Sequence, residues 1–216
     1  MSKFIKAEPG LNHSIIYTDN TGKRFLFSGG TWAWRNHNPG NLRPGESSRR
    51  HHQIGEVKAN KGKFAIFPDD KSGHDALIDL LTTTTYYDKS IDSTISKYAP
   101  KNENNTKKYI QFVHNQMNMK ENKKIKDLTP VEFEKLWKAI EKIEDYKVGK
   151  ITKLYEIREV HQKNGSIFEY YIPPIGWVSK AQCIKLAKAH HLDVIVCSSP
   201  SGNYIRSRPG KSPIKR

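Results

Sequence analysis

An asparagine-rich turn is the stretch of this chain whose side chains are best suited to binding a polar ligand. Five hydrogen-bonding side chains fall within seven positions: Arg35, Asn36, His37, Asn38 and Asn41. Amide groups both donate and accept hydrogen bonds, which suits sugar hydroxyls and N-acetyl groups. Trp32 and Trp34 offer flat apolar faces for pyranose rings. Asn, Pro and Gly are also ordinary turn residues, so a capped surface turn is an equally simple interpretation.

Two glutamates are candidates for acid–base chemistry. Glu144 lies four residues after Ile140 and seven after Trp137, so it extends the apolar stripe of a helix. Apolar surroundings favour the protonated form of a carboxyl group, although a rim carboxylate paired with a lysine would fit the same position. Glu103 lies in a polar loop between two helices, where capping the next helix is the simpler role. Glu46 and Glu56 remain candidates because they lie in the same long loop as the turn.

The elements that must position these residues follow from periodicity and capping signals. Residues 13–28 predict a β-hairpin, residues 31–62 a long irregular segment, and residues 64–67 a short strand. Helices are predicted over residues 72–87, 91–98, 105–118 and 130–146. The last is the best specified, because Thr129 and Glu132 form a capping box and Pro130 occupies the first helical position.

The pattern changes after Gly149. Strands are predicted over residues 151–160, 167–172, 192–197 and 204–207, with a helix from Ser179 to about His190. This is a small ββαββ unit, so we expect one domain over residues 1–149 and a second over 150–216. The second part has 12 basic and 4 acidic residues, which makes it the more basic of the two per residue.

Composition excludes several classes of protein. The net charge of +15 predicts attraction to a polyanion, namely nucleic acid, an anionic membrane surface or an anionic cell wall. No apolar run is long enough to span a membrane, and the start MSKFIKAEPG lacks the apolar core of a signal peptide. Cys183 and Cys197 are too few for a disulfide framework, and we expect two free thiols. The adjacent pairs His51-His52 and His190-His191 do not face one point, so we expect no metal and no cofactor.

Several segments, in order, are similar to a known family. TWAWRNHNPGNLRPG resembles the WRNNNPGNI signature of phage-associated and type VI-secreted cell-wall lytic proteins. The segments 62–68, 98–109 and 139–149 resemble that family's GxFAVFP, YAPPxENDTxxY and AIxxxEGxxxG motifs, and Gly73 matches a helix-opening glycine. The chain departs from the family pattern at Asp145, where the family has glycine after the glutamate. At the other end, residues 176–180 and 204–209 resemble an uncharacterised small domain with GWVSKEEAI and YIRSRP motifs.

The resemblance implies an α+β protein: a mainly helical, lysozyme-like domain with an N-terminal β-hairpin, then the small ββαββ domain. It implies cleavage of peptidoglycan glycan strands, by a muramidase or a lytic transglycosylase. Such cleavage needs a protonated carboxylic acid, for which Glu144 and Glu103 are the candidates. The substrate-binding candidates are Trp34, Arg35, Asn36, Asn38, Asn41 and Tyr98.

Partners and location follow from the same resemblance. We expect a protein made in the cytoplasm that acts in the periplasm or wall of a target bacterium after specialised export or lysis. A secretion-system component and an immunity protein are expected partners, whereas membrane insertion is not. Two alternatives stay open: a nucleic-acid-binding protein or nuclease, suggested by the charge and the Arg49-Arg50-His51-His52 run, and a non-enzymatic phage structural or adaptor protein.

Overall fold

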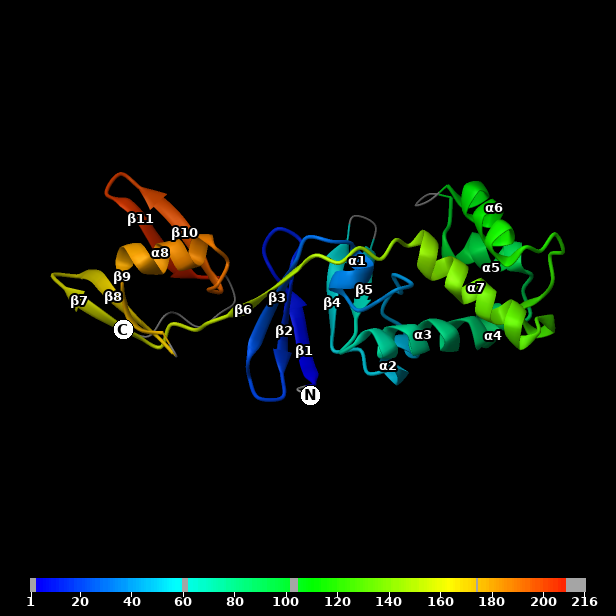
Figure 1. Ribbon diagram of the computed structural model, residues 1–216, viewed down its shortest axis with the longest axis horizontal. Helices are drawn as coiled ribbons and strands as arrows, with labels where there is room; N and C mark the ends of the chain where they lie inside the picture. Colours follow the sequence, from blue (N-terminus) through cyan, green and yellow to red (C-terminus); the bar gives the residue numbers. More distant parts are fainter. Residues whose placement is uncertain (1–2, 60–61, 102–104, 174, 209–216) are drawn as a thin grey trace. The chain divides into compact units, whose positions relative to one another are not determined.

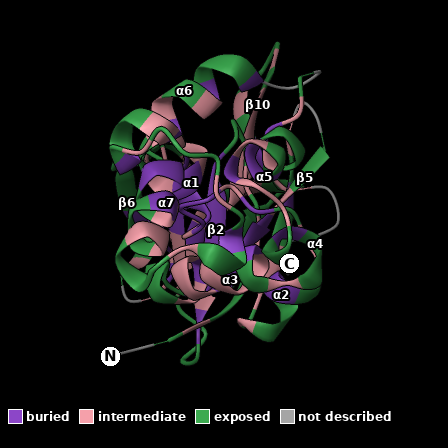
Figure 2. Ribbon diagram, turned by 90° about the vertical axis from the view of Figure 1, so that its right-hand side faces the viewer, coloured by how far each residue is buried: buried purple, intermediate pink, exposed green. Residues whose placement is uncertain are grey.

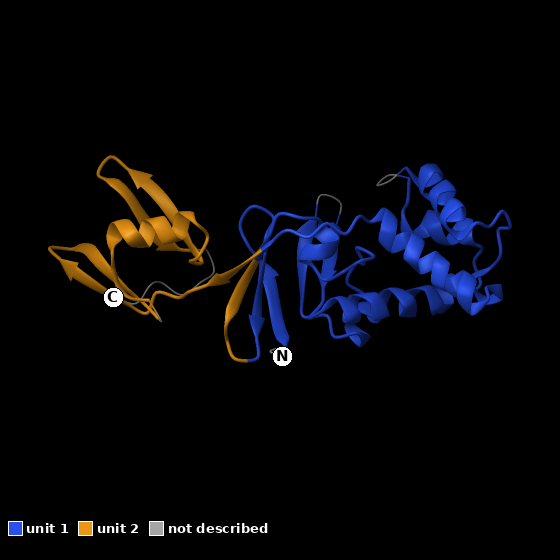
Figure 3. Ribbon diagram, in the orientation of Figure 1, with its two compact units in different colours: residues 1–20, 27–150 blue, residues 21–26, 151–216 orange. Residues whose placement is uncertain are grey.

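The chain divides into two compact units, each described here by itself (Figure 3). The computed structural model describes residues 3–59, 62–101, 105–173 and 175–208. Unit 1 comprises Met1–Asn20 and Phe27–Lys150, and unit 2 comprises Thr21–Leu26 and Ile151–Arg216. The sequence placed Thr21–Leu26 in the first domain. The structure places it in unit 2, where the Arg24 guanidinium is 2.8 Å from the Asp193 carboxylate.

Helix and strand are present in nearly equal amounts, 36% and 32% respectively, so the protein is mixed α and β. The expected predominance of helix is not confirmed. Two causes are visible in unit 1 (Figure 1). An unpredicted strand, β1 (Phe4–Pro9), pairs antiparallel with β2 (Ile15–Asp19), and β3 (Arg24–Ser28) follows in the same sheet. The segment predicted as irregular also contains β4 (Gly55–Ala59), which pairs with β5 (Gly62–Ile66).

The helices of unit 1 begin largely where the capping residues predict. They are α1 (Trp32–Arg35), α2 (Glu46–Arg50), α3 (Asp70–Thr82), α4 (Thr84–Tyr87), α5 (Ile91–Tyr98), α6 (Thr106–Met117) and α7 (Pro130–Ile143), with a 3₁₀ turn at Ile125–Asp127. The single helix predicted over residues 72–87 is interrupted at Thr83, whose backbone is extended. The capping box of Thr129 and Glu132 at the start of α7 is confirmed.

The core of unit 1 lies among α3, α5, α6 and α7. Fully buried side chains from these helices include Leu77, Ile95, Val113 and Ile140. In Figure 2 the helices carry their buried residues on inward-facing sides, while outer turns, such as those of α6, are exposed. Burying apolar side chains is the main favourable term in folding, so this cluster fixes which face of α7 points inward.

Unit 2 packs one helix against two small antiparallel sheets. The strands are β6 (Lys150–Leu154), β7 (Glu159–Lys163), β8 (Ser166–Ile172), β9 (Gly176–Ser179), β10 (Val194–Ser199) and β11 (Gly202–Ser207), and the helix is α8 (Lys180–Lys188). The sheet orders are β7-β8-β9 and β10-β11, and the start of β3 neighbours β6. The predicted strand 151–160 is therefore two strands, and β9 was not predicted. Cys183 is buried and Cys197 half-buried, both as free thiols.

Candidate active site

Glu144 lies immediately after the last residue of α7, and the local sequence explains its orientation. Its backbone N–H still donates to the carbonyl of Ile140 (3.1 Å), so it caps the helix in line with the buried stripe. The next residue, Asp145, has a φ of 56°, in the left-handed region that commonly ends helices. Glycine favours this conformation and aspartate tolerates it.

The Glu144 carboxylate accepts two hydrogen bonds in a largely buried position. The Asn41 amide Nδ2 donates to Oε2 at 2.8 Å, and the Tyr109 hydroxyl donates to Oε1 at 2.9 Å. Burial raises the pKa of Glu144 above the ordinary glutamate value, and the two hydrogen bonds only partly oppose that rise. Burial likewise raises the pKa of Tyr109, so its hydroxyl remains a donor. The carboxyl group therefore keeps its proton to a higher pH than a solvent-exposed glutamate.

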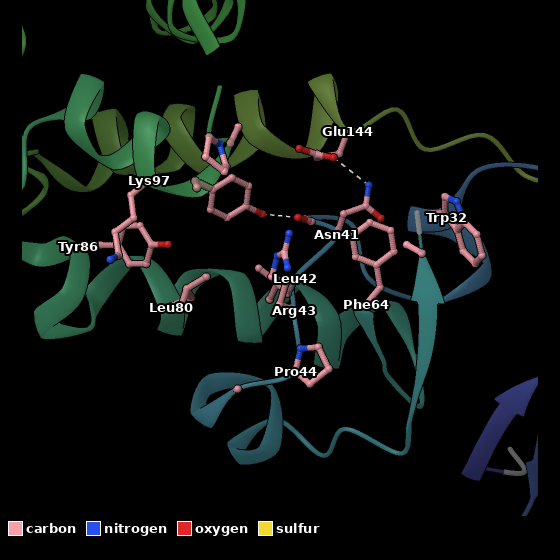
Figure 4. A pocket seen from close by; sticks show the side chains of 16 residues that line it. Trp32, Asn41, Leu42, Arg43, Pro44, Phe64, Leu80, Tyr86, Lys97 and Glu144 are labelled. Carbon is pink, nitrogen blue, oxygen red and sulfur yellow. Dashed lines mark hydrogen bonds between the residues drawn. The ribbon is translucent and has the colours of Figure 1, made fainter. Parts of the chain in front are cut away.

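Glu144 and Asn41 face a cavity of about 610 Å³ within unit 1 (Figure 4). In Figure 4 the side chains of Glu144 and Asn41 point toward each other. Trp32 and Phe64 lie at one end of the cavity lining, and Tyr86 and Lys97 lie at the other. The cavity is lined by Trp32, Gly40, Asn41, Leu42, Arg43, Pro44, Gly45, Ala59, Phe64, Leu80, Tyr86, Lys97, Tyr98, Ala99, Pro100 and Glu144. Among these residues Glu144 is the only carboxylate, and Arg43 and Lys97 are cations.

Of the other predicted binding residues, Tyr98 lines the cavity and Trp34 does not. Tyr98 lines the cavity, and its hydroxyl donates to the carbonyl of Gly40. Burial raises the pKa of Tyr98, so this donor too stays protonated. Trp34 does not line the cavity; it is 5% exposed, and its ring lies 5.1 Å from that of Phe27. The structure therefore places Tyr98 with the carboxyl group and Trp34 in the packed interior.

Three polar residues of the turn are also absent from the cavity lining. Arg35 is 7% exposed and donates through Nη1 to the carbonyls of Gly29 (2.6 Å) and Gly30 (2.7 Å). The Asn38 amide makes three hydrogen bonds to backbone groups of Leu42 and Ala65. Asn36 is fully buried, and neither of its amide atoms has a hydrogen-bond partner.

The remaining glutamate candidates are not brought to the cavity. Glu46 pairs with Arg50 at 2.5 Å on α2, and Glu56 pairs with Lys63 between β4 and β5. Glu103 lies outside the described residues. Within the part of the chain that is described, no three or more His, Cys, Asp or Glu side chains gather as metal ligands. No helix in that part is long and apolar enough to cross a bilayer.

Residues that sequence reasoning missed hold the turn against the segment after Glu144. Asp70 accepts hydrogen bonds from the Tyr146 hydroxyl (2.6 Å) and the His37 imidazole Nδ1 (2.9 Å). Burial raises the pKa of Asp70, but these two hydrogen bonds outweigh it and hold the pKa below the ordinary value. Asp70 is the first residue of α3, and Asp69 is the residue that caps the helix. Nothing in the local sequence linked Asp70 to residues 33 positions before it and 76 after it.

Two glycines allow close approach of the site's segments. A Cβ at Gly73 would lie 2.0 Å from the His37 carbonyl oxygen, so α3 can approach the turn only with glycine there. A Cβ at Gly149 would lie 2.3 Å from the carbonyl oxygen of Ser28.

Comparisons of this chain with protein-family models and with curated proteins found no match.

Proposed function

We propose that unit 1 cleaves the glycan strands of peptidoglycan, with Glu144 as the general acid. The observation that carries this proposal is the environment of Glu144: the one carboxyl group among the described residues that line the cavity, largely buried and with a raised pKa. Breaking a glycosidic bond requires a proton on the leaving oxygen, and a desolvated glutamate supplies that proton near neutral pH. The resemblance of the asparagine-rich turn to cell-wall lytic proteins supports the same substrate.

The proposed step transfers the Glu144 proton to the glycosidic oxygen as the bond to the anomeric carbon breaks. The anomeric carbon becomes oxocarbenium-like, and water or a hydroxyl of the same sugar forms the new C–O bond. The Glu144 carboxylate then takes up the proton that this attacking hydroxyl releases. Asn41 and Tyr109, each donating to one carboxylate oxygen, hold the group in place and stabilise the charge that appears after transfer.

The rest of the lining fits a peptide-bearing glycan. Trp32 and Phe64, whose ring centroids are 6.1 Å apart, offer apolar faces for sugar rings. The buried Oδ1 of Asn41 has no partner and is available to accept a hydrogen bond from a sugar hydroxyl or acetamido N–H. Arg43 and Lys97 place positive charge at the cavity, which favours the carboxylates of the peptide stems. Because peptidoglycan lies outside the cytoplasm, we also propose delivery by specialised export or lysis, with a secretion component and an immunity protein as partners.

The test is digestion of purified peptidoglycan by the wild type and Glu144→Gln, with mass spectrometry of the soluble products. We expect Glu144→Gln to lower release of muropeptides roughly 10²–10⁴-fold, the usual contribution of a general acid. Glu141→Gln is the matched control, since Glu141 lies one turn earlier and pairs with His74 at 2.6 Å. Full activity in Glu144→Gln would exclude Glu144 as the acid. Reducing ends in the products would identify a hydrolase, and anhydro ends a transglycosylase.

A further inference from the structure

The outer face of the β7-β8-β9 sheet in unit 2 bears a row of aromatic rings. The centroids of His161 and Trp177 are 3.7 Å apart and their rings are stacked, and Tyr171 is 5.5 Å from Trp177. Phe168 completes the row at 6.0 Å from His161. Trp177 is 41% exposed and Phe168 is 46% exposed, which is unusual for such large apolar side chains. Clustered exposed aromatics of this kind mark interaction sites.

The strand register explains why these rings face outward. Tyr170 pairs with Val178, and both belong to the core that packs on α8. Neighbouring residues on a strand alternate in direction, so Tyr171 and its partner Trp177 point to the other side. Phe168 is the extra residue of a β-bulge, because His161 pairs with Glu169 while Gln162 pairs with Ile167. The bulge turns Phe168 to the solvent instead of the core.

Charge on this face selects the kind of ligand. Glu159 pairs with Tyr171 and Glu169 pairs with His161, so both carboxylates share the face with the rings. Lys163, two residues after His161 on β7, adds one positive charge at the end of the same face, so carboxylates outnumber cations there by two to one. The His161 imidazole Nδ1 lies 3.1 Å from the Glu169 carboxylate. The exposed lysines Lys185 and Lys188 belong to α8, the helix on the opposite side of this sheet. Carboxylates repel a phosphate backbone but accept hydrogen bonds from sugar hydroxyls.

We propose that this face, defined by Phe168, His161, Trp177 and Tyr171, is a second carbohydrate-binding site that stacks pyranose rings of a polysaccharide. The flat rings contact the apolar C–H faces of the sugars, and Glu159 and Glu169 accept hydrogen bonds from their hydroxyls. An uncharged ligand held mainly by stacking and by hydrogen bonds from its hydroxyls depends little on salt, unlike a polyanion held by lysines. The site retains the protein on an insoluble glycan whatever chemistry unit 1 performs.

The test measures retention of the full chain on purified peptidoglycan, together with calorimetric titration of soluble β-1,4-linked N-acetylglucosamine oligomers. All variants are made in the Glu144→Gln background so that the glycan is not consumed. We expect Trp177→Ala with Phe168→Ala to weaken retention at least tenfold, and Trp177→Phe, which keeps a ring, to weaken it much less. Lys185→Ala with Lys188→Ala is the matched control and should bind normally. The melting temperature of each variant shows whether unit 2 stays folded.

Two results would overturn the proposal. One is unchanged retention of a folded Trp177→Ala, Phe168→Ala variant. The other is loss of retention in the lysine variant together with a steep fall of wild-type binding with salt, which would mean that a polyanion docks on α8. Failure of the proposed enzyme activity is distinguishable from both, because it appears as absence of soluble products from the protein with Glu144 intact, whereas the difference in retention between the aromatic variant and its Glu144→Gln parent does not depend on that activity. If the site in unit 2 serves only to retain the protein on insoluble glycan, the aromatic variants with Glu144 intact should cleave short, soluble glycan fragments at the wild-type rate.

Discussion

Asn38 and Asn41 are two amides of one turn, three positions apart, and the structure uses them differently. Asn38 is fully buried and its side-chain amide bonds to backbone groups of Leu42 and Ala65, so it fixes the shape of the turn. Asn41 has a left-handed backbone, with a φ of 48°, and its amide donates to Glu144 across the cavity. The structure gives Asn38 a structural role, and the proposed mechanism gives Asn41 a chemical one. Substitutions should therefore separate stability from activity.

The largest effect on stability is expected at Asn38. Asn38→Ala removes the side-chain partners of the Leu42 N–H and the Ala65 carbonyl in a buried place, whereas the Leu42 carbonyl still accepts from the N–H of Ala65. Unsatisfied buried groups cost about 1–3 kcal/mol each, so we expect roughly 2–5 kcal/mol of lost stability in urea or thermal unfolding. A loss below 1 kcal/mol would mean that Asn38 does not hold the turn.

Asn41→Ala should lower activity and leave stability nearly unchanged. The loss of one hydrogen bond to a carboxylate predicts an activity about 10–100-fold lower, from roughly 1.5–3 kcal/mol of interaction, while the fold stays intact. The Asn41 amide lowers the pKa of Glu144, so its removal raises that pKa further. The acid must be protonated to act, so the alkaline limb of the pH–rate profile should move to higher pH. Movement to lower pH, measured on soluble glycan fragments, would contradict the role given to Asn41.

A smaller effect is expected on the pH dependence of folding stability, through the carboxyl group of Glu144. A carboxyl group whose pKa is higher in the folded state stabilises the fold only while it is protonated. Stability is therefore lost as pH rises from the unfolded value of about 4.3 through the folded pKa. Glu144→Gln removes this loss, so we expect the variant to be more stable than the wild type at neutral pH. That advantage should disappear in thermal melts below about pH 4.

The smallest effect is expected at Asp145, where α7 leaves the site. A left-handed conformation costs a non-glycine residue about 1–2 kcal/mol, and glycine removes this cost. Glycine also has more conformational freedom in the unfolded chain, which offsets part of the stabilisation. Asp145→Gly should therefore stabilise by roughly 0.5–1 kcal/mol. Asp145→Ala, at the same φ of 56°, should destabilise instead. Equal melting temperatures for both variants would show that this backbone is not strained.

The sequence predicted local features of this molecule well and long-range ones poorly. The start of α7 was clear because its capping box, its proline and its apolar stripe agree. The apolar stripe also pointed to Glu144 as a buried carboxyl. The strand β1 was missed because its FIKAEP sequence shows only a weak alternation, with one buried residue. The segment 31–62 concealed β4 and two short helices among turn residues.

Within the site, the split between Asn38 and Asn41 had no sequence signal, since both are amides of one turn. Their roles depend on partners far along the chain, at Ala65 and Glu144. Tyr109 falls within the predicted helix 105–118 and the motif segment 98–109, and neither pattern indicates that its hydroxyl donates to the candidate acid. Periodicity shows which face of a helix is buried, but it does not show which distant side chain meets that face.

Titration of the Glu144 carboxyl by ¹³C NMR tests the central claim most directly. The signal is assigned by its absence in Glu144→Gln. We predict a midpoint above the ordinary glutamate value of about 4.3, and a higher one still in Asn41→Ala. A midpoint at or below the ordinary value would mean that Glu144 is ionised at neutral pH and does not act as the acid.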